Sequence, residues 1–380
     1  MPAQPKIVFL ITEDWCFLTH RLDLAVSLQR RGWEVIIATQ VNTESDRARI
    51  EGAGLRVFSL PLQRARLVAL GDLVYWWRIL QLYRRERPAL VHHVAMKPVL
   101  YGSLAALFVP HLRVVNAVAG LGFLFSSPSP GVKIVRSLVV AAFRLLFSRP
   151  RTCLILQNRE DFGFFAGLGI PRDKLRLIRG AGVDLIHFQP TVHGQRHPPV
   201  AVLAARMLKD KGVLELVAAA RLLKQANIPI RVLLAGGVDP QNPNSLRPDE
   251  LRGFELEGTV QWLGHQGNMA AVYGSADIAV LPTSYREGVP KTLLEAAACA
   301  LPIVASDSAG CREVVQEGVN GYLVPARDSQ ALAAALTRLA TDPGLRKQMG
   351  QASREIAQRD FAHTLVIEQT QAIYWELLAR

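Results

Sequence analysis

The sequence is poor in several features that define common protein classes. It has four cysteines among 380 residues, widely separated, so neither a disulfide scaffold nor a closely spaced zinc site is expected. Aromatic residues make up 7% of the chain and do not alternate with basic residues, and no helix-turn-helix or finger pattern occurs, which argues against a nucleic-acid-binding module. No Gly-x-Gly-x-x-Gly motif follows the first apolar run, which disfavours a dinucleotide-dependent oxidoreductase.

Long apolar runs are also missing. No stretch reaches the roughly 18 uninterrupted apolar residues of a membrane-spanning helix, and the nearest, residues 138–147, is broken by Arg144. The run at residues 7–11 is too short for a signal sequence, and Glu13 and Asp14 follow it. We therefore expect a cytoplasmic protein that does not cross a membrane.

Two folded domains are predicted, because half of the residues are apolar and the chain exceeds the usual size of one hydrophobic core. Apolar runs alternate with helical segments from residue 7 and again from residue 200, which predicts an α/β protein with two Rossmann-like domains facing across a cleft. We place the domains at 1–185 and 195–360, with a linker in the Pro- and Gly-containing stretch 184–199. The expected strands are 7–11, 35–38, 57–60, 90–94, 114–118, 152–156, 200–205, 231–235, 260–263, 278–281 and 303–305.

The excess of positive over negative charge lies entirely in the first half of the chain. The formal net charge is +12, and residues 1–180 contain 25 Lys and Arg against 12 Asp and Glu, whereas the remainder contains 19 against 20. This asymmetry indicates an anionic partner for the first half, either acidic lipid or nucleic acid.

A candidate membrane-contacting helix lies in this basic half. Residues 133–149 place Lys133, Arg136 and Arg144 on one face at helical spacing, and apolar residues occupy much of the remainder, as in helices that lie in a membrane interface. The apolar stretch 122–128 precedes it. The alternative is an ordinary helix packed on a sheet with an exposed basic face. Together with the charge, the pattern favours peripheral contact with an anionic membrane surface.

Two acids eight positions apart mark a candidate ligand site. The segment REGVPKTLLE, residues 286–295, bends at Gly288 and Pro290 and then enters an alanine-rich helix. Because the first amides of a helix lack partners and its dipole is positive there, such a segment attracts phosphate. Glu287 would then lie at the mouth, and Glu295 would be within reach of a ribose. Taken alone, Glu287 also fits a carboxylate that merely stabilises a helix start.

Two cations follow the strand expected at residues 200–205. If the ligand is a nucleotide sugar, Arg206 and Lys211 could face its diphosphate, on which negative charge builds as the glycosidic bond breaks. Fixed cations at this point stabilise the transition state more than the ground state. The alternative is a solvated basic turn, and the later Glu287 to Glu295 segment favours the catalytic interpretation.

These segments resemble the signature of the family 4, retaining glycosyltransferases with the GT-B fold, and the match continues through LLEAAACALP, GCREVV and GVNGYLV up to residue 324. The resemblance implies that Glu287 contacts the donor sugar, Glu295 the ribose, and Arg206 and Lys211 the diphosphate. It also implies that residues 361–380 form a helix that packs back on the N-terminal domain. The predicted nucleotide-binding residues are Gly264, His265, Gly288, Val289, Pro290, Lys291, Thr292 and Glu295.

The first half resembles a subgroup of family 4 that builds lipid-linked oligosaccharides, including bacterial enzymes that add N-acetylgalactosamine to undecaprenyl-diphosphate sugars. The motifs that carry this resemblance are FLTHRL, VHHVAMKPVLYG and VNAVAGLGF. It implies a catalytic role for His20. A strand points His92 and His93 to opposite faces, so at most one of them meets the cleft, and the choice stays open. The predicted acceptor-binding residues are His93, Lys97, Asn116, Lys133 and Arg136.

The sequence thus predicts a retaining glycosyltransferase that moves a hexose or N-acetylhexosamine from a nucleotide diphosphate sugar, with UDP expected, to a lipid-linked polyprenyl-diphosphate glycan. Retention without an evident carboxylate nucleophile suggests front-face attack within an ion pair. No Asp-x-Asp motif accompanies the site residues, so neither a metal nor another cofactor is expected. A nucleotide-sugar 2-epimerase of the same fold and a transferase acting on a soluble acceptor remain alternatives. We expect the protein at the inner face of the cell membrane.

Overall fold

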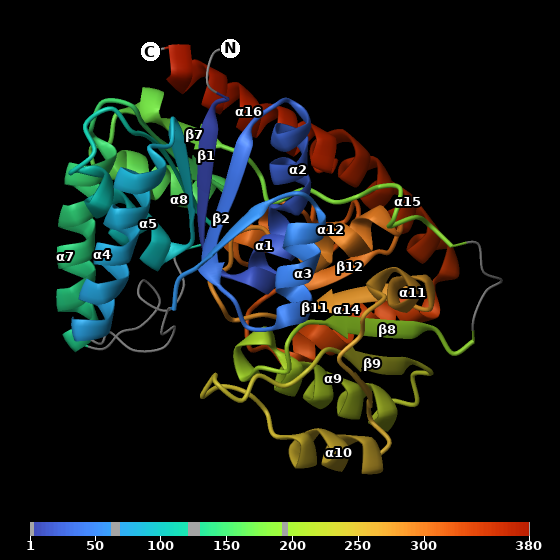
Figure 1. Cartoon of the computed structure of the whole chain (residues 1–380). Helices are drawn as coiled ribbons and strands as arrows, with labels where there is room; N and C mark the ends of the chain where they lie inside the picture. Colours follow the sequence, from blue (N-terminus) through green and yellow to red (C-terminus); the bar gives the residue numbers. More distant parts are fainter. Residues whose placement is uncertain (1–3, 62–68, 121–129, 192–196, 380) are drawn as a thin grey trace. The chain divides into compact units, whose positions relative to one another are not determined.

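The computed structural model describes residues 4–61, 69–120, 130–191 and 197–379, and these form two compact units (Figure 1). Unit 1 comprises Met1–Ala181 and Thr364–Arg380, and unit 2 comprises Gly182–His363. Each unit is built on one parallel β-sheet. The apolar stretch 122–128 lies outside the described residues.

The sheet of unit 1 has seven strands in the order β3-β2-β1-β4-β5-β6-β7, so the order reverses between β1 and β4. Its central strands are buried along most of their length, as expected for a parallel sheet covered on both faces. The strands are β1 (Lys6–Glu13), β2 (Glu34–Gln40), β3 (Arg56–Ser59), β4 (Leu90–Val94), β5 (Arg113–Val118), β6 (Thr152–Leu156) and β7 (Leu175–Leu177).

Helices cover both faces of this sheet. One face packs against α4 (Ala69–Glu86), α5 (Met96–Ala106), α7 (Pro130–Phe147) and α8 (Arg159–Gly167), and the other against α1 (Asp14–His20), α2 (Leu22–Arg30), α3 (Glu44–Gly52) and α16 (His363–Ala379). The C-terminal helix α16 is held on unit 1 by polar contacts as well. Arg113 Nε donates to the Leu377 carbonyl at 2.7 Å, and Arg176 contacts both carboxylate oxygens of Glu376. Within the described ranges, no helix is long and apolar enough to span a membrane.

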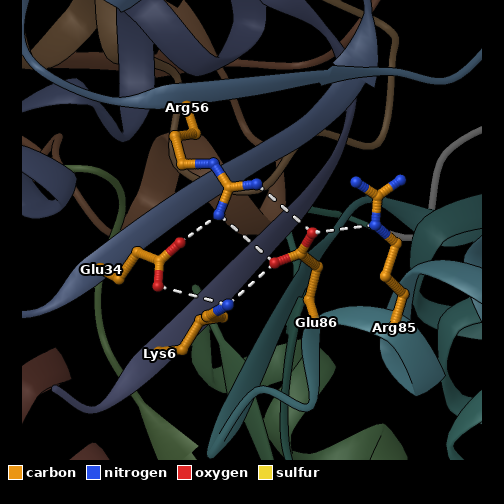
Figure 2. A network of polar contacts seen from close by, with 5 residues as sticks. All are labelled: Lys6, Glu34, Arg56, Arg85 and Glu86. Atoms are coloured by element: carbon orange, nitrogen blue, oxygen red, sulfur yellow. Dashed lines mark hydrogen bonds and ion pairs between the residues drawn. The ribbon is translucent and has the colours of Figure 1, made fainter. Parts of the chain in front are cut away.

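A charged network joins the amino-terminal ends of three strands of unit 1 (Figure 2). Glu86, at the end of α4, accepts from Lys6 Nζ at 2.8 Å and from Arg56 at 3.3 Å. Glu34 also pairs with Lys6 and Arg56. Lys6, hydrogen-bonded to Glu86, lowers the pKa of that carboxyl. Since ligands of parallel sheets bind at the opposite, carboxyl-terminal edge, this network is structural.

The sheet of unit 2 has six strands in the order β10-β9-β8-β11-β12-β13. One face packs against α9 (Val213–Gln225), α10 (Pro248–Leu256) and α14 (Ser329–Thr341), and the other against α11 (Met269–Gly274), α12 (Lys291–Ala298), α13 (Ala309–Arg312) and α15 (Pro343–Asp360). The strands are β8 (Val200–Ala204), β9 (Arg231–Ala235), β10 (Gln261–Gly264), β11 (Ile278–Leu281), β12 (Ile303–Ser306) and β13 (Gly321–Val324).

The described parts of the stretch predicted as a linker, residues 184–191 and 197–199, lie within unit 2. Val183 pairs with the segment before α16, donating to the Phe361 carbonyl at 2.8 Å. Arg354 of α15 donates to the carbonyls of Leu185 and Phe188. Gly182 has φ +77°, and a Cβ there would lie 2.6 Å from a backbone atom of His363, so this crossing requires glycine.

Candidate active site

Lys211 and Glu287 form an ion pair at the carboxyl-terminal edge of the unit 2 sheet. Lys211 ends a short 3₁₀ turn after β8, Glu287 lies in the loop between β11 and α12, and Nζ is 2.8 Å from Oε1. Their strands are neighbours in the sheet, so the loops that follow them adjoin. The Asp210 carbonyl accepts from the Ser284 amide at 2.9 Å, which holds the two loops together. Lys211, a predicted phosphate-binding cation, and Glu287, the predicted sugar-binding carboxylate, are therefore in direct contact.

Two glycines allow these loops to approach so closely. Gly212 follows Lys211 with φ +80°, and a Cβ on it would lie 2.1 Å from the Pro282 carbonyl oxygen. A Cβ on Gly310, in α13, would lie 1.4 Å from the Gly288 oxygen. Contacts this short are incompatible with any side chain, so both positions fix the loop that carries Glu287.

Arg206 lies near the same edge but makes a different contact. Its guanidinium pairs with the carboxylate of Asp239, in the loop after β9, at 2.5 Å, and its side chain is 40% exposed. The Asp239 amide in turn donates to Ser245 Oγ at 2.9 Å. Lys211 therefore contacts Glu287, whereas Arg206 contacts Asp239. A diphosphate that binds Arg206 would have to displace the Asp239 carboxylate.

The N-terminus of α12 directly follows the Glu287 loop. Pro290 is its N-cap residue and offers no side-chain acceptor to the first amides, and the Leu293 amide bonds back to the Pro290 carbonyl at 3.1 Å. The helix dipole therefore directs its positive end to the region of Lys211 and Glu287. The predicted phosphate-binding residues placed at this helix start are Gly288, Val289, Pro290, Lys291 and Thr292.

Glu295 is buried on α12, with 8% of its surface exposed. Burial raises the pKa of its carboxyl to about 7, against the opposing effects of the Lys291 charge, 3.9 Å away, and of the Tyr273 hydroxyl. Desolvation penalises the ionised form, so this acid changes charge near neutral pH. Its predicted ribose contact uses the ionised form as a hydrogen-bond acceptor.

The predicted base-binding pair lies at the end of β10. Gly264 has φ +68°, and its carbonyl accepts from the Gly236 amide at 2.8 Å, so the ends of β9 and β10 are joined. His265 is exposed, and a Cβ on Gly237 would lie 3.5 Å from its Cβ. The predicted base-binding residues therefore lie beside Gly236 and Gly237, at the adjoining ends of β9 and β10.

His93 and Asn116, two predicted acceptor contacts, are completely buried in unit 1. His93 Nδ1 lies 2.7 Å from Asn116 Oδ1, and its Nε2 lies 2.8 Å from the Tyr83 hydroxyl. Burial lowers the pKa of His93 to about 4, so the ring is neutral at physiological pH. A Cβ on Gly102 would lie 2.6 Å from this ring. This placement gives both residues a packing role and does not support the predicted direct contact with an acceptor.

His92 points to the opposite face of β4, as its position on a strand predicts. Its ring stacks on Phe9 and its Nδ1 bonds to the Tyr374 hydroxyl of α16. Burial lowers the pKa of His92 well below its ordinary value. Neither His92 nor His93 has exposed surface, so neither ring reaches solvent in unit 1.

The other predicted residues of unit 1 lie on α1, α5 and α7. His20 is the last residue of α1 and is half-buried, and its carbonyl accepts from the Arg21 guanidinium at 3.0 Å. Lys97, in the first turn of α5, pairs with Asp72 of α4 at 3.1 Å. On α7, Lys133 is exposed and Arg136 is half-buried.

Two family models match the chain in series. The glycosyl transferase 4-like model matches residues 6–158, within unit 1, and the model of glycosyl transferases group 1 matches residues 188–356, within unit 2. The chain belongs to the group 1, family 4-like glycosyltransferases. The protein is therefore a glycosyltransferase.

Curated bacterial relatives match this glycosyltransferase over nearly its whole length. It is 27% identical to the N,N'-diacetylbacillosaminyl-diphospho-undecaprenol alpha-1,3-N-acetylgalactosaminyltransferase of Campylobacter jejuni, over 93% of this chain and 95% of that protein. It is also 27% identical to the putative glycosyltransferase EpsD of Bacillus subtilis, over 97% and 96%.

Solved structures identify the fold of the glycosyltransferase as GT-B. The sucrose-phosphate synthase of Thermosynechococcus elongatus superposes with a TM-score of 0.77 at 19% identity, covering 99% of this chain and 100% of that one. HepE of Anabaena, solved in complex with UDP, gives 0.76 at 18% identity, with 98% and 100% covered.

Two residues of the glycosyltransferase site were missed from the sequence. Asp239, which holds Arg206, follows a parallel strand, and the rule that ligands gather at strand carboxyl ends was a signal that would have found it. Tyr273, whose hydroxyl lies 3.4 Å from Glu295 Oε2, is a single tyrosine in a short helix, and nothing in the local sequence distinguishes it.

Proposed function

We propose that this glycosyltransferase moves a hexosyl or N-acetylhexosaminyl group from a nucleotide diphosphate sugar, with UDP as the nucleotide, to a polyprenyl-diphosphate-linked glycan, with retention of configuration. The observation that carries the proposal is the contact between Lys211 and Glu287 beside the start of α12. A cation, a carboxylate and a helix N-terminus together match the diphosphate and the sugar of such a donor.

In the proposed reaction, the bond between the anomeric carbon and the diphosphate oxygen breaks, and the acceptor hydroxyl oxygen bonds to the same face of that carbon. The hydroxyl proton passes to the departing diphosphate, so no carboxylate nucleophile is required. Lys211 and Arg206 stabilise the negative charge that develops on the diphosphate. Glu287 orients the sugar, and Glu295 accepts from the ribose. Because the cations supply the positive charge, the proposal includes no divalent metal.

Two observations support the proposed acceptor: the acceptor named for one relative, and the positive charge of residues 1–180. The C. jejuni relative is named as acting on an undecaprenol diphosphate glycan. Residues 1–180 carry a large excess of basic residues, which suits a diphosphate and an anionic membrane. As part of this proposal, we assign Lys97, Lys133 and Arg136 to acceptor binding, and His20 to catalysis.

Peripheral membrane contact through α7 is part of the same proposal. Ile134, Leu138 and Leu145 lie along one face of α7, each 67% exposed, and Lys133 and Arg144 are exposed beside them. Apolar side chains flanked by cations fit the interface of an anionic bilayer. On α4, Leu73, Val74 and Trp77 are also exposed. Figure 1 shows α4 and α7 on the same side of the sheet of unit 1.

The test is a screen of UDP- and GDP-sugars with a polyprenyl-diphosphate monosaccharide acceptor, read by the mass of the product. The expected product is the acceptor plus one hexose or N-acetylhexosamine, with the anomer of the donor preserved in its NMR coupling constants. Interconversion of donors without any acceptor would instead identify an epimerase. Transfer to the soluble sugar alone, with none to the lipid-linked form, would contradict the proposed acceptor.

A further inference from the structure

Tyr273 links the start of α12 to the carboxylate of Glu295. It lies in α11 with 1% of its surface exposed. Its hydroxyl donates to the Thr292 carbonyl at 3.0 Å and has Glu295 Oε2 within reach at 3.4 Å. One hydroxyl hydrogen therefore serves both the first turn of α12 and the acid assigned to the ribose.

Few groups favour the ionised form of this buried carboxylate. Lys291, one turn earlier on α12, is 3.9 Å away, and Tyr273 is the other neighbour that lowers its pKa. Cys299, one turn later, stays a neutral thiol, because burial raises its pKa to about 12 despite the charge of Arg354 on α15. When a donor diphosphate engages Lys291, the hydroxyl of Tyr273 still lies within reach of Glu295.

We propose that Tyr273 is a positioning residue for donor binding, which holds Glu295 as an ionised acceptor for the ribose hydroxyls and fixes the first turn of α12 through Thr292. Without the hydroxyl of Tyr273, the buried carboxylate of Glu295 would lose a hydrogen-bond donor that favours its ionised form. The proposal rests on the assignment of Glu295 to the ribose in the proposed function. Tyr273 touches neither the sugar nor the diphosphate in this scheme.

The test compares the full-length wild-type chain with Tyr273→Phe. Titration calorimetry measures binding of UDP and of 2′,3′-dideoxy-UDP, which lacks the ribose hydroxyls, from pH 6.5 to pH 9. At pH 7 the variant should bind UDP about fivefold more weakly, while its affinity for the dideoxy nucleotide changes little. At pH 9, where Glu295 ionises in both proteins, UDP affinities should agree within about twofold.

A matched control is Ser275→Ala, which removes a side-chain hydrogen bond to the Val272 carbonyl next to the same helix without touching Glu295. It should leave the preference for UDP over the dideoxy nucleotide unchanged at every pH. A Tyr273→Phe defect that is equal for both nucleotides, or independent of pH, would show a merely structural role and overturn the inference. If the wild-type chain binds UDP without preferring it to the dideoxy form, the ribose assignment itself fails.

Discussion

Lys211 and Glu287 reach each other from two neighbouring strand ends of unit 2, with 2.8 Å between Nζ and Oε1. Each side chain is mostly buried, at 17% and 13% exposure, so the pair is screened from water more than a surface pair. A sugar diphosphate that enters this place meets a fixed cation and a fixed acceptor together.

Removal of either member of this pair should impair turnover. Lys211→Ala and Glu287→Ala are each expected to lower the glycosyl transfer rate by more than about tenfold, because charge on the leaving diphosphate and the orientation of the sugar are both lost. Initial rates with the donor and acceptor identified by the screen measure the effect. Arg221→Ala, which breaks an exposed pair with Glu257 on the same unit, should keep the normal rate. Near-normal rates in both site variants would remove the assigned roles.

Asp239 should compete with the donor for Arg206. The Asp239 carboxylate pairs with the Arg206 guanidinium, so Asp239→Asn is expected to strengthen UDP binding. The pair is partly exposed, and its contribution of about 0 to 1 kcal/mol limits the gain to roughly fivefold. Calorimetry with UDP measures the gain. Weaker binding would show that Asp239 positions Arg206 rather than competing with the diphosphate.

Glu295 should carry a stability cost that depends on pH. Its folded-state pKa, about 7, lies above the ordinary glutamate value, so ionisation destabilises the fold. The cost is absent below the ordinary value and is complete above about pH 7. Glu295→Gln is therefore expected to raise the melting temperature by about 2 to 4 °C at pH 8 and by less at pH 5. The same variant should bind UDP about tenfold more weakly at pH 8. An equal shift in melting temperature at both pH values would contradict the inference that ionisation of Glu295 destabilises the fold.

Glu86, in the charged network at the amino-terminal edge of the unit 1 sheet, should stabilise the fold when ionised, whereas Glu295 should destabilise it. The pKa of Glu86 is lowered, chiefly by its bond to Lys6, so its contribution is present above the ordinary glutamate pKa and disappears as pH falls through the lower folded-state value. Glu86→Gln is expected to reduce the free energy of unfolding by about 1 to 2 kcal/mol at pH 7. Urea unfolding followed by circular dichroism measures the change. Glu257→Gln, at an exposed pair, should cost less.

The exposed apolar face of α7 should be required for membrane association. The double variant Leu138→Gln with Leu145→Gln is expected to weaken co-sedimentation with phosphatidylglycerol vesicles by about tenfold or more, since each buried leucine contributes about 1.5 to 3 kcal/mol. Salt should weaken the remaining binding. Leu256→Gln is a matched control, because Leu256 is 90% exposed on α10 of unit 2. Equal loss in the control would show that α7 is not specific for the bilayer.

Much of the fold could be predicted because most of its strands contain short runs of buried apolar residues. Every expected strand is present within a residue or two, for example β4 at Leu90–Val94 and β11 at Ile278–Leu281. The three-residue β7 and the edge strand β13 were not named, because each is short and only partly apolar. The stretch 184–199 looked like a linker from its prolines, but the contacts of Arg354 that hold its first part on unit 2 come from a distant helix.

The candidate site was predictable where a local sequence pattern marks its residues, and not where it depends on contacts between distant segments. The segment from Glu287 to Glu295 gave the loop and helix together, and Lys211 followed from its place after a strand. The partner of Arg206 depended on how the loop after β9 folds, which no local pattern specifies. The burial of His93 against Tyr83 similarly depends on α4, so a polar strand end was indistinguishable from an acceptor site.

The division of unit 1 between the two ends of the chain bears on biosynthesis. Its sheet is complete after residue 181, yet His92 and the apolar face around Phe9 are covered by α16, which follows unit 2 in the sequence. Unit 1 therefore cannot complete its fold until unit 2 has been synthesised. A chain truncated after residue 363 should accordingly show a protease-resistant unit 2 and a protease-sensitive unit 1, and chaperones should engage the face that α16 leaves uncovered.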